Sequence, residues 1–188
     1  MKKARNELVG SVECLGMNTL HYAPPAYLIT FHTYGTWLPG DPRGTVTREH
    51  NQYGEPRRGG CDALLERSRG LLRNPPVALH AAERVVVLRA FQHVCRHRAW
   101  TLHAAHVRTN HAHVVVGAEA SPGRIMGDLK AWATRRLVEA GHRPRGVPRW
   151  VRQGSTRSLW QRTAVEAACF YVLHEQGDIL LGAVSPAP

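Results

Sequence analysis

Four short segments rich in β-branched and aromatic residues are predicted to form strands. Residues 27–33 (YLITFHT) are the first, and residues 100–107 and 111–117 are the second and third. Such residues fit a pleated, half-buried surface. A tight turn at 108–110 joins the second and third segments, so they should form an antiparallel hairpin. A short last strand is expected within 156–161.

Three longer segments repeat apolar residues at helical spacing, at 77–97, 121–140 and 163–176. The middle segment has the clearest ends, because Ser121 is a good N-cap followed by proline, and Gly141 stops it. Its apolar residues lie on one side of the predicted helix and should face the core. They are Ile125, Leu129, Trp132, Ala133 and Leu137.

The order strand, helix, strand, strand, helix, strand predicts an α+β fold of the ferredoxin-like kind. In this fold an antiparallel sheet carries helices on one face, and here a C-terminal helix is added. We expect residues 1–25 to form a loosely ordered tail and residues 26–188 a single domain. Residues 34–76 are rich in Gly, Pro, Asp and Arg and predict an insertion without regular structure. Such long insertions are usually functional or mobile.

Composition excludes several classes of protein. Hydrophobic residues make up 43% of the 188 residues and charged residues 21%, which is typical of a globular domain. No stretch approaches the ~20 apolar residues of a membrane helix, and no secretory signal is evident. The four scattered cysteines favour neither a zinc ribbon nor a disulfide framework. We therefore expect a cytoplasmic, nucleoid-associated protein with no membrane partner.

The charge favours a polyanionic partner. The net charge is +11 and the pI is about 10.4. Between Ser121 and Arg162, ten basic and two acidic residues give a net +8. Nine of the ten are arginine, whose guanidinium suits bidentate phosphate contacts, so nucleic acid is the favoured partner. A solvated basic face without a partner is the alternative.

Two histidines two residues apart are the first candidate for chemistry. His111 and His113 lie on a predicted strand, where residues i and i+2 share one face, so both imidazoles could bind one metal ion. Ala112, Val114 and Val116 should face the core instead. By itself the pattern is also compatible with two surface histidines, since the chain has 12.

The last predicted helix adds a tyrosine and a carboxylate. Tyr171 and Glu175 are at i and i+4, on one helix face. The residues before Tyr171 on that face are small and should leave room for a ligand, whereas the opposite side should pack on the sheet. The small residues are Ala164, Ala167 and Ala168, and the packing residues are Val165, Cys169 and Val172. A core tyrosine beside a solvated charge is the alternative.

Together these residues suit phosphoryl transfer. A phenol is a nucleophile at phosphorus once its ionisation is assisted. Two neutral imidazoles and a carboxylate could hold Mg²⁺ or Mn²⁺, with the scissile phosphate filling open positions. The metal would polarise and orient the phosphate for in-line attack. The product would be a covalent phosphotyrosine.

Four stretches of the chain carry a family resemblance. They are TYGTWLPGDPRG (33–44) with TREHNQYGEP (47–56), VRTNHAHVVV (107–116), LKAWATRRL (129–137), and GSTRSLW (154–160) with FYVLHEQGD (170–178). In these stretches the sequence resembles the HUH endonuclease superfamily, in particular the IS200-like and REP-associated tyrosine transposases.

The resemblance implies a ferredoxin-like enzyme that cuts and rejoins single-stranded DNA, often beside a hairpin, through a 5′-phosphotyrosine. It implies Tyr171 as nucleophile, His111 and His113 as metal ligands, and Glu175 as the third ligand. Relatives usually have Gln or Asn at the position of Glu175, so the choice of metal stays open.

Other residues are candidates for DNA contact. Trp37, in the insertion with Tyr53, suits base stacking on a single strand, and a folded lid is an equal alternative. The candidate phosphate contacts are Arg124, Lys130, Arg135, Arg136, Arg152 and Arg157.

Three other functions stay open on the sequence alone. They are a replication-initiator nickase of the same superfamily, a catalytically silent nucleic-acid-binding module, and a zinc hydrolase that works without Tyr171. The sequence also leaves open the target hairpin, and whether the protein is a monomer or a homodimer.

Overall fold

The computed structural model describes residues 24–44, 59–142 and 144–177. Its centre is a four-stranded antiparallel sheet in the order β2-β3-β1-β4. The strands are β1 (Ala26–His32), β2 (Thr101–Val107), β3 (His111–Gly117) and β4 (Ser155–Leu159). This is the strand order of the ferredoxin-like fold, so the predicted fold class is confirmed.

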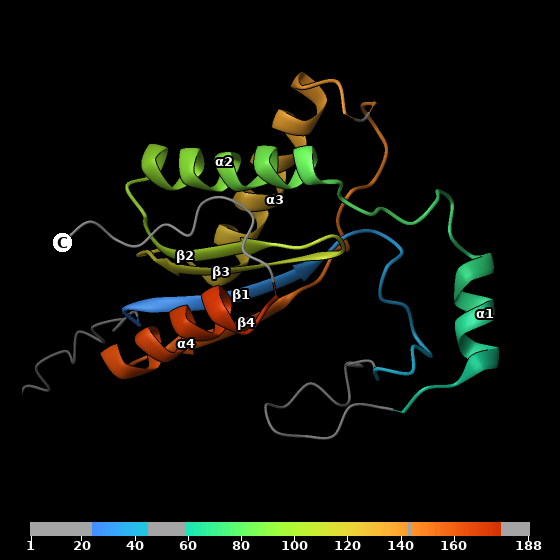
Figure 1. Ribbon diagram of the computed structural model, residues 1–188, viewed down its shortest axis with the longest axis horizontal. Coiled ribbons are helices and arrows are strands. Elements are labelled where there is room, and N and C mark those ends of the chain that lie inside the picture. Colours follow the sequence, from blue (N-terminus) through green and yellow to red (C-terminus); the bar gives the residue numbers. More distant parts are fainter. Residues whose placement is uncertain (1–23, 45–58, 143, 178–188) are drawn as a thin grey trace, which may run out of the picture.

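The helices form two layers around the sheet (Figure 1). Helices α2 (Ala81–His97) and α3 (Pro122–Glu139) cover one face, and α4 (Arg162–His174) covers the other. A further helix, α1 (Asp62–Gly70), stands apart from the sheet. Among the residues described, no helix is long and apolar enough to cross a membrane.

The main core lies between the sheet and the layer of α2 and α3. Ala112, Val114 and Val116 of β3 point into it and are fully buried, as the alternation predicts. The α3 stripe is also confirmed, since four of its residues are fully buried and Trp132 packs against the cluster. On α2, Val85 lies outside the buried set, whereas Val87 and Phe91 are fully buried.

A smaller apolar cluster joins α4 to the opposite face. It contains Ala26, Ala104, Val115, Leu159, Ala168 and Val172, with Val165 and Cys169 packed against it. The predicted packing side of α4 is therefore confirmed. The predicted open alanine flank is wrong at two positions, because Ala168 is buried in this cluster and Ala164 packs on it. Of the three alanines, Ala167 is exposed.

The insertion contains regular structure that the sequence pattern did not predict. Helix α1 buries none of its residues, so it lacks the apolar spacing by which helices are recognised. Asp62 in its first turn and Arg69 in its last turn suit the helix dipole. Residues 1–23 and 45–58, which include most of the predicted tail and Tyr53, lie outside the described residues.

Helix α2 begins four residues later than predicted. The segment before it is extended: the N–H of Val77 donates to the Tyr34 carbonyl (2.8 Å) and the N–H of Leu79 to the Thr109 carbonyl (2.7 Å). These bonds to distant residues replace the helical ones. The N-terminus of α3 matches its prediction, with the Ser121 hydroxyl accepting from the N–H of Arg124.

Lys130, a predicted phosphate contact, has backbone partners within the fold. Its half-buried ammonium donates to the carbonyls of Val151 (3.1 Å), Arg152 (3.3 Å) and Gln153 (3.2 Å) and lies over the ring of Phe31. Burial lowers the pKa of Lys130 to about 8. A phosphate contact by Lys130 would require these hydrogen bonds to break.

We predict that Lys130→Met destabilises the protein by about 1–3 kcal/mol, because it removes a charged donor from three carbonyls. Arg135→Ala on the same helix, at an exposed position, should change stability by less than about 0.5 kcal/mol. Urea unfolding followed by circular dichroism measures both. Equal stability of Lys130→Met and the wild type would contradict the structural role.

Candidate active site

Strand register gathers the polar residues on the α4 face of the sheet. In the β1–β3 pair, His32 lies opposite His111 and Thr30 opposite His113. In the β2–β3 pair, His106 lies opposite His113. Cross-strand partners share a face, so these five side chains form two adjacent polar rows. The predicted proximity of His111 and His113 is confirmed by a distance of 4.8 Å between their ring centroids.

A series of neighbouring rings, called the ring series below, includes the histidine pair and extends on both sides of it. It runs from Trp37 through His32, His111 and His113 to Tyr171. The ring of Tyr171, on α4, meets that of His113 edge to face at a centroid distance of 5.6 Å. On the other side, His111 is 5.3 Å from His32, and His32 is 4.3 Å from Trp37 in the insertion. Tyr171 is 38% exposed. The structure therefore brings Tyr171 beside the histidine pair and leaves the tyrosine accessible to a substrate.

Hydrogen bonds fix the orientation of both imidazoles. Nδ1 of His111 lies 2.6 Å from Oδ1 of Asn110, and Nδ1 of His113 lies 2.7 Å from Oγ1 of Thr30. Engagement of one ring nitrogen by an outer polar group is typical of histidines that bind metal through the other. Nε2 is thus the nitrogen that each ring could offer to a metal.

Both imidazoles are held in the neutral form. Burial, and then the neighbouring charges of His113, His32 and Arg108, lower the pKa of His111 to about 3. Burial is also the largest cause that lowers the pKa of His113, to about 4, while a hydrogen bond with Gln176 opposes the shift. A neutral imidazole is the form that binds metal, so the electrostatics suit that role.

The structure places Gln176, rather than Glu175, at His113. Glu175 is exposed just after the end of α4, and its N–H donates to the Tyr171 carbonyl (3.1 Å). Gln176 is 9% exposed and hydrogen-bonds His113. The predicted i, i+4 stacking assumed a helix to residue 176, but α4 ends at His174. Within the described part of the chain, no three His, Cys, Asp or Glu side chains are grouped to hold a metal.

The donor set nevertheless fits a divalent metal. Both imidazoles are neutral and have Nδ1 engaged, and the side-chain amide of Gln176, which could supply one oxygen ligand, lies next to His113. Two nitrogens and one oxygen on one side of an ion leave its other positions for phosphate oxygens and water.

Arg108 also lies beside the histidine pair, although the sequence pattern did not single it out. It follows β2, and its N–H donates to the His111 carbonyl (2.8 Å). Its side chain reaches the end of α4, since a Cβ built on Gly177 would lie 3.0 Å from Nη1. Its charge acts on both His111 and His113. In the sequence, the feature that could have identified Arg108 is its position in the turn at 108–110, directly before His111.

The first part of the insertion is a folded loop tied to the site. The Asn110 carbonyl accepts from the N–H of Thr33 (2.9 Å) and from the hydroxyls of Thr33 (3.1 Å) and Thr36 (3.3 Å). The indole N–H of Trp37 donates to the Gly44 carbonyl (2.9 Å), and Arg43 lies over its ring. These contacts favour the folded-loop alternative for residues 33–44.

The predicted phosphate contacts fall on two sides of the sheet. Arg124, Arg135 and Arg136 belong to α3, in the layer opposite Tyr171. Arg135 and Arg136 lie against the Trp132 ring, and Arg136 also pairs with Glu139 at 2.7 Å.

Arg157 lies on the Tyr171 side instead. Its cross-strand partner Leu28 packs in the α4 cluster, as does Leu159, two residues further along β4. Arg152 is exposed just before β4. Among the predicted phosphate contacts, Arg157 therefore shares the sheet face of the candidate site.

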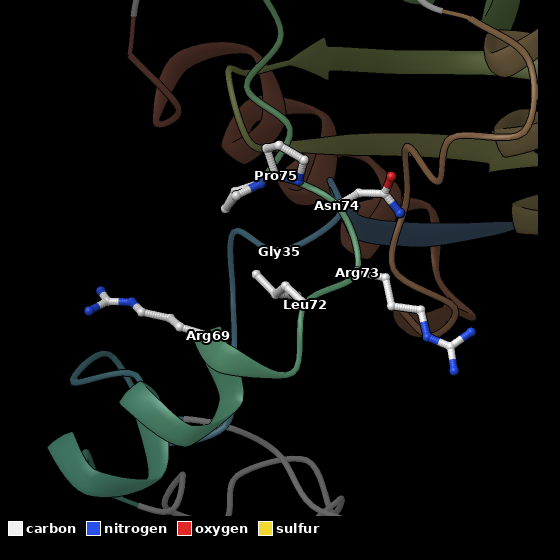
Figure 2. A pocket seen from close by; sticks show the side chains of 7 residues that line it. Gly35, Arg69, Leu72, Arg73, Asn74 and Pro75 are labelled. Carbon is white, nitrogen blue, oxygen red and sulfur yellow. The ribbon is translucent and has the colours of Figure 1, made fainter.

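A surface hollow of about 460 Å³ lies on the insertion rather than at the histidines. Figure 2 shows it between Gly35 and the segment after α1, with the side chains of Arg69 and Arg73 extending to opposite sides of Leu72. It is open, and its lining includes none of the residues of the ring series described above.

Comparison with solved structures shows a likeness in fold, whereas comparison by sequence finds none. No protein-family model and no curated protein matches the sequence. Among solved structures, the chain is similar to a REP-associated tyrosine transposase bound to a REP hairpin, with a TM-score of 0.48 and 10% sequence identity. The match covers 93% of this chain and 72% of the other.

Proposed function

We propose that the protein cleaves and rejoins single-stranded DNA by metal-dependent transesterification, with Tyr171 as the nucleophile. One observation carries the proposal: an exposed tyrosine ring lies 5.6 Å from the ring of His113, which is itself adjacent to His111. The candidate nucleophile on α4 and the candidate metal ligands on β3 thus lie side by side.

The metal would be held by Nε2 of His111, Nε2 of His113 and the amide oxygen of Gln176. Gln176 replaces Glu175 in this proposal because it is the residue that contacts His113. When bound, Mg²⁺ or Mn²⁺ supplies Lewis-acid polarisation of the scissile phosphate.

In the proposed reaction, the phenolic oxygen of Tyr171 attacks the scissile phosphorus. A Tyr–O–P bond forms, the bond from phosphorus to the 3′ oxygen breaks, and the phenolic proton is lost while the leaving 3′ oxygen gains one. The product is a 5′-phosphotyrosine, a phosphodiester like the bond that was cut. Attack by a free 3′-hydroxyl reverses the step and rejoins a strand, so cleavage and strand transfer use the same residues.

Arg108 and Arg157 would bind the DNA at the site. Arg108 places a cation beside both histidines, where the charge on the equatorial phosphate oxygens must be stabilised. Arg157 lies further along the same sheet face. A hairpin-forming single strand is the proposed substrate, and the arginines of α3 would add contacts to its phosphates from the opposite layer.

Replacement of Tyr171 by phenylalanine should abolish covalent attachment, because the attacking oxygen is lost. The matched control is Tyr34→Phe, since the Tyr34 hydroxyl accepts from the N–H of Arg73 in the insertion and lies outside the ring series. Denaturing gels with a labelled hairpin oligonucleotide measure the adduct. An adduct that persists in Tyr171→Phe assigns the nucleophile elsewhere; no adduct in the wild type favours a silent binding module.

The metal proposal predicts a difference between two neighbouring residues. His111→Ala, His113→Ala and EDTA should each abolish cleavage, and Gln176→Ala should reduce its rate by on the order of 10-fold or more. Glu175→Ala should have little effect, because that side chain is exposed. Cleavage rates across a Mn²⁺ titration measure these effects. A larger loss of cleavage rate in Glu175→Ala than in Gln176→Ala would assign Glu175 as the ligand instead.

The basic surface of α3 should affect affinity but not chemistry. We expect Arg135→Ala with Arg136→Ala to reduce the salt dependence of single-stranded DNA binding by up to about two log units per log unit of salt. Adduct formation at saturating DNA should stay unchanged, because α3 lies across the sheet from Tyr171. Fluorescence anisotropy at several salt concentrations measures the slope. An unchanged slope would mean that this face is only solvated.

A further inference from the structure

His106 is a buried polar residue between the sheet and α4. It lies on β2 and is 5% exposed. Its Nδ1 is 3.2 Å from the carbonyl oxygen of Val172. A carbonyl oxygen only accepts hydrogen bonds, so this contact requires the proton of the neutral imidazole on Nδ1.

The carbonyl that His106 contacts belongs to the end of the tyrosine helix. The last four carbonyls of a helix lack an N–H partner from the next turn. In α4, the Tyr171 carbonyl accepts from the N–H of Glu175, after which the chain turns away at Gly177, with a φ of 78°. The Val172 carbonyl accepts from His106 instead. A side chain from β2 thus takes the place of a missing helical hydrogen bond.

The same histidine is also the cross-strand neighbour of a candidate metal ligand. His106 lies directly opposite His113 in the β2–β3 pair. Val172 follows Tyr171, and its side chain is fully buried in the cluster below α4. One residue therefore contacts the helix turn that carries Tyr171 and is paired with the strand position that carries His113.

We propose that His106 is a positioning residue, which holds the last turn of α4 so that the Tyr171 oxygen stays aligned with the site at His113. The effect on catalysis rests on the proposed function. The hydrogen bond from His106 to the Val172 carbonyl, called the tether below, does not depend on it. His106 lies beneath the helix and acts through the backbone of Val172, without touching the substrate.

Two substitutions separate the hydrogen bond from simple packing. His106→Asn places an amide N–H near the position of Nδ1 and keeps a donor for the Val172 carbonyl. His106→Leu fills a similar space without a donor. At saturating hairpin DNA, His106→Leu should slow single-turnover adduct formation by about 10- to 100-fold, because small misplacements of reacting groups have effects of this size. DNA affinity should stay within about twofold of the wild type, and His106→Asn should recover most of the rate.

A rate for His106→Leu equal to that of the wild type would overturn the proposal. Equal losses in both variants would also overturn it, because packing alone would then explain the effect.

Hydrogen exchange tests the tether without any reference to activity. In His106→Leu, the amide of Glu175, which closes the last turn of α4, should exchange at least about tenfold faster. Amides in the middle of α2 should be unchanged. Unchanged exchange at Glu175 would refute the tether. If the wild type forms no covalent adduct, the proposed function fails while this measurement still decides the role of His106.

The wild-type protein provides a further measurement if His106→Leu does not fold. Nitrogen-15 NMR of the histidine side chains should show His106 as the tautomer with the proton on Nδ1. A proton on Nε2 would exclude donation to Val172 and overturn the proposal.

Discussion

The antiparallel pairing of β1 with β3 is the constraint on which the rest of this structure depends. It places His32 against His111 and Thr30 against His113, with every one of these side chains on the face covered by α4. The same register sends Phe31, Ala112 and Val114 to the opposite face, into the main core. Slipping the pairing by one residue would exchange the two faces, burying histidines and exposing the core. Stability and the candidate chemistry are therefore specified together.

The two faces of the sheet are covered by side chains of different size. Large side chains of α2 and α3 fill the main core, whereas alanines and valines supply most of the contact with α4. Small residues let a helix approach the sheet closely. This close approach allows the Tyr171 ring to contact His113 from a helix, and allows the His106 ring to reach the backbone of that helix. A larger residue at Ala168 would push the helix, and the tyrosine with it, away from the histidines.

Asn110 connects the insertion to the candidate site. Its carbonyl accepts the donors of Thr33 and Thr36, and its side chain contacts Nδ1 of His111. The loop also presents Trp37 to His32. Because these contacts share one residue, the conformation of the loop and the orientation of His111 are coupled. The insertion thus contacts the candidate site through a hairpin turn that is distant from it in sequence.

The sequence by itself determined the strands, three of the four helices and the faces that β3 and α3 turn to the core. Alternation along β3 put His111 and His113 on one face, and the apolar spacing of α3 identified its buried stripe. Both follow from local backbone geometry, which repeats every two residues in a strand and every 3.6 in a helix. The proximity of Tyr171 to His113 came from the family resemblance, and the fold then confirmed it.

Only the tertiary structure decided which side chains complete the site. Thr30 and His113 are 83 residues apart in sequence, and His106 and Val172 are 66 apart, so no local pattern pairs them. The contact of Gln176 with His113 depends on where α4 ends, and it ends at His174, two residues before the predicted end. Lys130 carried the same charge as its neighbours, yet its position over Phe31 directs its ammonium to backbone carbonyls. The charge and spacing of residues can be read from the sequence, whereas the partners of each side chain depend on which distant segments the fold brings together.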